Sequence, residues 1–157
     1  MGHAFHSHPA HPRPVGLNQR PIILHVNVCV NGRRRILFNS EVMAALVHCW
    51  PSATQWVVGY FMIMPDHIHL FCAPNCLDPE PVRRWSGYWK RLAGKTAPIL
   101  KGAFQEDCWD TQMRSGEHYH RKQEYVANNP VRAGLVECSE DWPWQGRVAQ
   151  LPWLGGP

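Results

Sequence analysis

Two short apolar segments, residues 56–64 and 67–73, are separated only by Pro65-Asp66. Segments of this length that are bounded by turn residues are typical of strands, and so short a turn joins them into an antiparallel hairpin. Because apolar residues run almost without a break along both segments, we expect the hairpin to lie at the centre of a sheet. The rest of the fold must be arranged around it.

The elements on either side of the hairpin follow a recognisable order. Residues 22–30 alternate between apolar side chains and the face of His25, Asn27 and Cys29, which is the period-two pattern of a strand. The other expected elements are a helix capped by Ser40 and ended by Pro51, a basic amphipathic helix over residues 78–97, a strand at the sheet edge within residues 103–114, and a helix from Ser115 to Asn129 that Pro130 stops. This order predicts an α+β fold, namely a ferredoxin-like (split βαβ) sandwich with an antiparallel sheet plus an appended C-terminal helix.

The composition indicates one folded unit behind a tail. Of the 157 residues, 45% are hydrophobic, which is enough for a core, and we predict a single domain over residues 21–157. Residues 1–20 mix His, Pro and Gly without periodicity, so we expect a flexible tail. No apolar run is long enough to cross a bilayer and no secretory signal is visible, which predicts a cytoplasmic protein without membrane contact. The six cysteines contain no C-x-x-C pair, and we expect all of them to be reduced and structural.

Two histidines, His67 and His69, stand in the second segment of the hairpin, within MPDHIHLF. Residues two apart in a strand share a face, so both point to the side of Phe71, away from the helix-covered core that Ile68 and Leu70 face. We expect that side to be the open face of the sheet. Two neutral imidazoles on a rigid strand can begin a divalent-metal site, which then needs a ligand from elsewhere. The alternative is that both rings only hydrogen-bond backbone or water.

The segment EYVANNPVRAGLV contains a tyrosine on the helix that ends the predicted fold. We expect Tyr125 to be exposed, and Tyr119, which lines up with Val126, to pack in the core. An ordinary surface aromatic is equally consistent with the position of Tyr125. By the three-or-four spacing of a helix, its neighbours on a polar and basic surface are Arg121, Lys122, Asn128 and Asn129.

Three separated motifs in this order resemble a known family. MPDHIHLF is followed by WDTQMRSGEHY and then by EYVANNPVRAGLV, and the combination resembles the HUH-type single-tyrosine transposases, especially their REP-associated tyrosine transposase branch. HVNVCVNGRRRILF before the first motif and DWPW after the last are also similar to that family. The resemblance therefore extends from about His25 to Trp144.

The resemblance implies a site and a reaction. His67 and His69 match the histidine pair that holds Mg²⁺ or Mn²⁺, Tyr125 matches the nucleophile, and Asn129 matches the position from which relatives supply a third metal ligand. Such enzymes cut single-stranded DNA, keep the 5′ end as a phosphotyrosine and release a 3′-OH that later rejoins strands. The resemblance thus implies a metal-dependent endonuclease and strand transferase for hairpin or palindromic repeat DNA, a monomer or homodimer associated with the bacterial nucleoid.

DNA binding requires further side chains. A formal net charge of +4 permits an anionic partner, with nucleic acid as the first candidate. Aromatic side chains of the helix over residues 78–97 are candidates for stacking on unpaired bases, namely Trp85, Tyr88 and Trp89. The alternative is a solvated basic helix face with its tryptophans in the core. The candidate phosphate contacts are eight basic residues: Arg83, Arg84, Lys90, Arg91, Arg114, Arg121, Lys122 and Arg132.

Two other functions remain open from the sequence. One is a non-catalytic, DNA-binding regulatory module of the same fold, and the other is a metal-dependent phosphoesterase that uses water. Both differ from the first hypothesis in the role of Tyr125, which neither requires as a nucleophile.

Overall fold

The computed structural model describes residues 22–151, and the predicted tail of residues 1–20 lies outside the described residues. The helices and strands are β1 (Leu24–Cys29), α1 (Ser40–Cys49), β2 (Trp56–Ile63), β3 (His67–Pro74), α2 (Val82–Thr96), β4 (Trp109–Gln112), α3 (Gly116–Ala127), α4 (Asn129–Arg132) and β5 (Gln145–Arg147). Single turns of 3-10 helix lie between them: η1 (Asn31–Arg33), η2 (Trp50–Ser52), η3 (Pro98–Leu100) and η4 (Ser139–Asp141).

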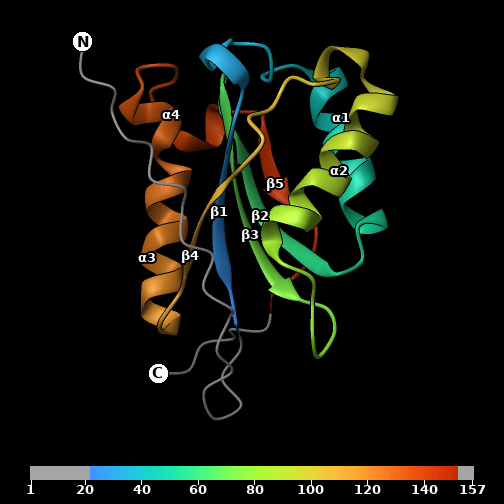
Figure 1. Cartoon of the computed structure of the whole chain (residues 1–157). Coiled ribbons are helices and arrows are strands. Elements are labelled where there is room, and N and C mark those ends of the chain that lie inside the picture. The colour runs from blue at the N-terminus through green and yellow to red at the C-terminus, as the bar shows by residue number, and fades with distance from the viewer. Residues whose placement is uncertain (1–21, 152–157) are drawn as a thin grey trace, which may run out of the picture.

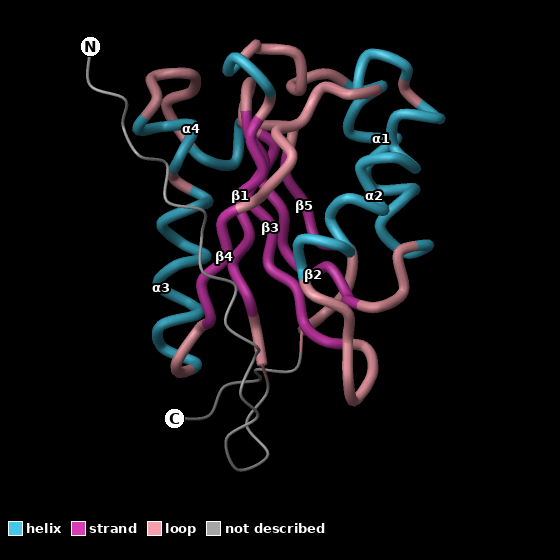
Figure 2. The backbone as a smooth tube through the Cα atoms, viewed as in Figure 1, coloured by secondary structure: helices cyan, strands magenta, loops and turns pink. Residues whose placement is uncertain are grey.

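The strands form one antiparallel sheet in the order β4-β1-β3-β2-β5, drawn in magenta in Figure 2. The hairpin of β2 and β3 lies inside the sheet and β4 forms one edge, both as the sequence predicts, and β1 pairs with β3. The α+β class is therefore confirmed. The edge strand β5 is not among the predicted elements, since three residues are too few to show a periodic pattern. The ferredoxin-like label stays a prediction, because a fifth strand and a further helical layer are added to it.

Helices cover both faces of the sheet. In Figure 1, α1 and α2 lie on one side of it and α3 and α4 on the other. The core under α1 and α2 contains Val26, Leu70 and the tryptophans of α2, all fully buried. A second core lies under α3, where the ring centroids of Phe71 and Tyr119 are 5.4 Å apart. Our expectation that the histidine face is open is therefore wrong. The histidine face also contains the apolar side chain of Phe71, whose burial is favourable, and α3 packs over it.

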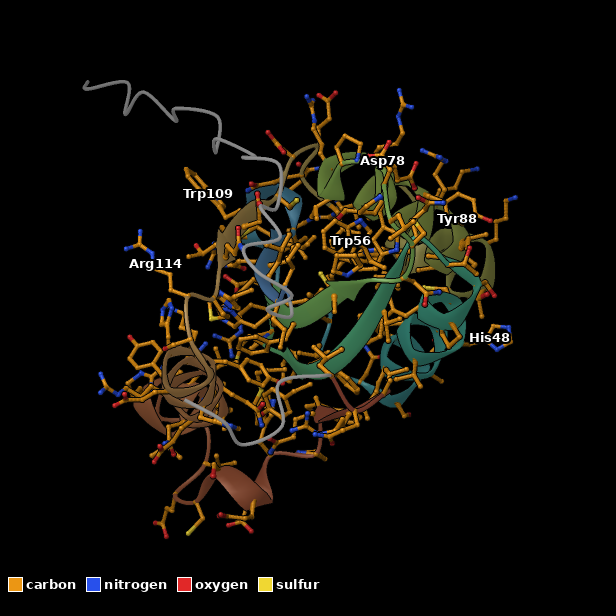
Figure 3. The ribbon with its side chains drawn as sticks, turned by 90° about the horizontal axis from the view of Figure 1, so that it is seen from below. His48, Trp56, Asp78, Tyr88, Trp109 and Arg114 are labelled. Carbon is orange, nitrogen blue, oxygen red and sulfur yellow. The ribbon has the colours of Figure 1, made fainter. Side chains whose placement is uncertain are left out.

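The tryptophans of α2 belong to the core and not to a stacking surface. Trp85 and Trp89 are fully buried, and the Trp85 indole N–H donates to the carbonyl of Ala53 at 2.8 Å. Of the two positions that the sequence leaves open for these tryptophans, the core is confirmed and base stacking is excluded. Tyr88 is 41% exposed. Figure 3 shows it on the side of the sheet opposite Arg114, with Trp56 enclosed between sheet and helix.

Helix boundaries differ from the sequence predictions at capping residues and prolines. The cap of α1 is Asn39 and not Ser40, because the Asn39 side chain accepts the Val42 N–H at 2.9 Å. Pro81 is the N-cap of α2, so this helix begins later than predicted. The Ser115 cap of α3 is confirmed by a 3.0 Å bond from the His118 N–H.

The predicted helix from Ser115 to Asn129 is divided in two. It ends at Ala127, and α4 begins at Asn129 after Asn128, whose φ and ψ are −86° and 0°. Pro130 has no N–H to donate to the turn before it, so α3 cannot continue, whereas a proline is well tolerated in the first turn of α4. Tyr125 and Asn129 consequently lie on two helices.

The remaining global expectations concern thiols and membranes. All six cysteines are free, as predicted; Cys76 and Cys138 are exposed, and the other four are buried. Within residues 22–151 no helix is both long and apolar enough to cross a membrane.

Candidate active site

The histidine pair stands at the start of β3, where the strand leaves the turn at Pro65-Asp66. Both side chains are partly buried on the α3 side of the sheet. Their Nε2 atoms face each other at 3.1 Å, with the two rings nearly perpendicular. Two nitrogens that bind one cation at right angles, each about 2.1 Å from it, lie about 3 Å apart, so this spacing fits a shared cation.

Each histidine is held from behind by a different partner. The Nδ1 of His67 is 2.7 Å from Asp66 Oδ1, and the other oxygen of Asp66 accepts from Arg33 at 2.8 Å. The Nδ1 of His69 is 2.9 Å from Nε2 of the buried His25, whose ring stacks on it at 5.1 Å. When each Nδ1 carries the proton and donates it backwards, each Nε2 keeps its lone pair toward the other ring.

Burial keeps these imidazoles neutral. It lowers the pKa of His69 to about 2 and that of His25 to about 3, with smaller contributions from nearby positive charge. Burial also lowers the pKa of His67, although Asp66 opposes that shift. A metal ion binds the neutral ring, so at neutral pH the pair loses no proton before it can act as a ligand.

The second half of the site comes from α3 and α4. Asn129 Nδ2 is 3.0 Å from His69 Nε2, and Asn129 Oδ1 accepts from Arg132 at 3.2 Å. The Arg132 guanidinium lies over the ring of Tyr125, 3.6 Å from its centroid, and the Lys122 ammonium is 5.2 Å from the same centroid. Tyr125 is 57% exposed, as expected, and is linked to the histidines through Arg132 and Asn129. Tyr119 and Val126 are buried, as expected.

The metal-binding capacity of this site depends on its amide. No group of three or more His, Cys, Asp or Glu within the described residues is suited to hold an ion. The pair His67 and His69 offers two nitrogens, and Asn129 offers an oxygen once its amide turns so that Oδ1 replaces Nδ2 beside them. Imidazole nitrogen with amide oxygen is a donor set that suits a divalent cation such as Mn²⁺.

The eight predicted DNA-binding residues fall into two separate groups. Lys122 and Arg132 flank Tyr125, and the exposed Arg121 pairs with Glu117 one turn away. Arg114 is exposed just before α3. The other four residues, Arg83, Arg84, Lys90 and Arg91, are on α2 and thus on the opposite side of the sheet.

Two of the α2 residues are engaged in the framework. Arg83 forms an ion pair with Glu106, and Lys90 donates to the backbone carbonyl of Gln105 at 2.9 Å. Burial lowers the pKa of Lys90. Arg84 and Arg91 remain exposed.

Sequence reasoning missed the residues that hold the histidines. The sequence predicts Asp66 only as a turn residue, although an acid directly before His67 is a signal that could identify it as a partner of that histidine. The sequence predicts His25 on the polar face of β1, but its contact with His69 depends on the pairing register, in which Asn27 is opposite His69. The pairing of strands 44 residues apart is not visible in the sequence of either strand.

Comparison with known proteins gives relatives of one kind. A protein of Escherichia coli strain K12 named REP-associated tyrosine transposase is 25% identical over 87 residues, which cover 55% of this chain and 52% of that protein. A protein of Haemophilus influenzae that is provisionally given the same name is 25% identical over 114 residues, covering 60% of this chain and 65% of that protein. The chain thus matches about half to two thirds of the length of these relatives. No family model matches.

A solved structure shares the fold. It is described as a REP-associated tyrosine transposase bound to a REP hairpin, and it superposes with a TM-score of 0.67 at 23% identity, covering 78% of this chain and 74% of the other. The resemblance inferred from the three motifs is therefore confirmed in sequence and in fold.

Proposed function

We propose that this chain is a metal-dependent transposase that cuts and rejoins single-stranded DNA with Tyr125 as its nucleophile. The observation that carries the proposal is the convergence of His67, His69 and Asn129 beside an exposed tyrosine whose ring is covered by Arg132. The names of the relatives support transposase activity. The identity of the nucleophile, the metal requirement and the DNA structure are parts of the proposal.

The proposed metal is Mg²⁺ or Mn²⁺, held by Nε2 of His67, Nε2 of His69 and the amide oxygen of Asn129. When bound, such a cation orients a phosphodiester by its non-bridging oxygens and offsets the charge that develops at phosphorus. The chain's own part is to present two neutral nitrogens at the right spacing. Asp66 and His25 fix the orientation of the rings from behind.

Tyr125 attacks the phosphorus of a phosphodiester through its hydroxyl oxygen. The hydroxyl loses its proton, a bond forms between its oxygen and phosphorus, the bond from phosphorus to the 3′ oxygen breaks, and the departing 3′ oxygen takes up a proton. The DNA 5′ end stays on the protein as a phosphotyrosine. An aryl oxide is also a good leaving group, so a 3′-OH can reverse the step and rejoin strands without ATP. Arg132 and Lys122 lie beside the ring, and we propose that they contact the phosphate.

The proposed substrate is single-stranded DNA next to a hairpin or palindromic repeat. The proposal is supported by the solved structure with the same fold, which is described as bound to a REP hairpin. The basic groups beside Tyr125, Lys122 and Arg132, together with the exposed Arg121 on α3 and Arg114 just before that helix, suit a phosphate backbone. Oligomeric state, as monomer or homodimer, and association with the nucleoid remain predictions.

The test is a covalent adduct. Labelled hairpin oligonucleotides with single-stranded extensions are incubated with the protein and Mn²⁺, then denatured and resolved by electrophoresis. We expect a protein–DNA band that a chelator prevents and that Tyr125→Phe abolishes. Tyr88→Phe is the matched control, because Tyr88 is also exposed but lies on α2, and it should leave the band intact. A band that persists in Tyr125→Phe contradicts the assignment.

The other two hypotheses give different results in the same assay. A non-catalytic module would retain the hairpin but never form a band or a cleaved product. A phosphoesterase that uses water would cleave without an adduct, and Tyr125→Phe would leave its hydrolysis largely unchanged.

A further inference from the structure

A cavity of about 460 Å³ lies between the second half of α2 and the segment that follows η3. We call it the α2–η3 pocket. Its walls are mostly apolar, with Leu100 and Phe104 among the residues that line it. Because α2 and α3 cover opposite faces of the sheet, the pocket is separate from the histidine site (Figure 1). Four basic residues also line it: Lys90, Arg91, Lys95 and Lys101.

The charge around the pocket is unbalanced. No Asp or Glu is among the lining residues. Lys90 is engaged with backbone carbonyls, but Arg91, Lys95 and Lys101 form no ion pair with any carboxylate of residues 22–151. An apolar hollow with unpaired cations at its edge is complementary to a ligand with an apolar body and an anionic group. A purely inorganic anion would gain nothing from the apolar walls.

The turn η1 connects the pocket to the histidine site. At one end of η1, the Asn31 side chain donates to the carbonyls of Gly102 and Phe104, at 3.3 and 3.0 Å, and so fixes one wall of the pocket. At the other end, Arg33 is held at a φ of 55° and donates to Asp66, the partner of the first histidine. The two sites therefore lie at the same end of the sheet, separated by one short turn.

The surface of this connection is positive. Arg33 is followed by Arg34 and Arg35, and all three are exposed. Arg33 is paired with Asp66, and Arg34 donates to the carbonyl of Asn31, so both lie at the turn η1 that joins the two sites. A DNA strand that leaves the tyrosine in this direction would meet positive charge along its path.

We infer that the α2–η3 pocket binds one unpaired nucleotide of the DNA strand on which Tyr125 acts, with the base against the apolar walls and its phosphates on Lys95 and Lys101. A nucleotide combines a flat, weakly polar base with adjacent anionic phosphates, which is the combination that the walls and rim require. The inference rests on the proposed function and adds a base-reading subsite to it, outside the site of cleavage.

The experiment separates the pocket from catalysis. Binding of hairpin oligonucleotides with single-stranded extensions is measured by fluorescence anisotropy, in a chelating buffer and with Tyr125→Phe, so that no strand is cut. Each nucleotide of the extension is replaced in turn by an abasic one. We expect one position at which loss of the base weakens binding about tenfold. In a protein that also carries Lys95→Glu and Lys101→Glu, the same replacement should change binding less than twofold.

Two comparisons decide the outcome. The control protein carries Lys101→Glu and Arg147→Glu and has the same net charge as the protein with Lys95→Glu and Lys101→Glu. Arg147 lies on the edge strand β5, outside the pocket, so the control protein should keep part of the base dependence that the protein with both pocket substitutions loses. If no abasic position matters, or if the effect survives in the pocket pair, the inference is wrong. If the base dependence behaves as expected but the native protein forms no adduct, the nuclease proposal fails and the nucleotide pocket stands.

Discussion

Replacement of His25 by phenylalanine isolates the contact that holds the second histidine. His25 is 8% exposed and lies between His69 and Phe71, with ring centroids 5.1 Å from each, so a phenyl ring of similar size fits the space. The replacement removes only the acceptor for the His69 Nδ1–H. His69 must then either bury an unpaired N–H while its Nε2 binds metal, or move its proton to Nε2, where it blocks the metal.

Both outcomes lower metal affinity by a calculable amount. A buried donor without a partner costs about 1–3 kcal/mol, which corresponds to roughly a 5- to 150-fold change in a binding constant. Loss of an outer partner of a metal-bound histidine typically weakens metal binding about 10- to 100-fold. We therefore expect His25→Phe to weaken Mn²⁺ binding about 10- to 100-fold, with only a small change in the thermal midpoint.

The assay is calorimetric or paramagnetic titration of the purified protein with Mn²⁺ in the absence of DNA. His25→Gln is the informative control, because its amide oxygen can still accept from His69 and should restore part of the affinity. His48→Phe removes an exposed histidine of α1 and should change nothing. Wild-type Mn²⁺ affinity in a well-folded His25→Phe protein would show that His25 only packs against its neighbours, and the reasoning would be refuted.

Three further predictions test other parts of the structure. Arg132→Ala removes the cation over the Tyr125 ring and should reduce the rate of adduct formation at least tenfold while Mn²⁺ affinity falls less than threefold; equal losses in both would contradict this separation. Ser115→Ala removes the side-chain cap of α3 and should lower the free energy of unfolding, measured by urea denaturation, by about 0.5–2 kcal/mol; an unchanged value would contradict the cap. Burial lowers the pKa of His25 to about 3 and that of His69 to about 2, so below pH 6.5 these two residues take up protons in the unfolded chain but not in the folded protein. The free energy of unfolding of the metal-free protein should therefore be highest above pH 6.5 and fall steadily below it. A flat profile from pH 6.5 to 4.5 would contradict the burial of these rings.

The central hairpin was predictable because it is a local pattern. An unbroken apolar segment on each side of Pro65-Asp66 leaves little choice of structure, and the face shared by His67 and His69 follows from the period of a strand. The cap at Ser115 is equally local, since a serine side chain reaches an N–H only three residues away.

The features that sequence missed depend on contacts between distant segments. The histidine face of the sheet is covered because α3 packs on Phe71, and nothing within the sequence of β3 specifies which element packs there. The contact of His25 with His69 depends on the register between two strands. Burial of Trp85 and Trp89 was open because a basic amphipathic helix has the same pattern whether its aromatic stripe faces a core or a ligand.

The break between α3 and α4 explains how one short segment supplies two groups with different requirements. On a continuous helix, residues four apart project almost in the same direction, so an asparagine turned toward buried histidines would bring a tyrosine four positions earlier toward the sheet as well. Pro130 ends α3 and lets α4 set its own direction. Asn129 can therefore reach His69 at 3.0 Å while Tyr125 stays 57% exposed. Arg132, from the same short helix, then spans the gap between amide and ring, so the position of the proposed nucleophile is fixed from α4 while its approach from solvent stays free.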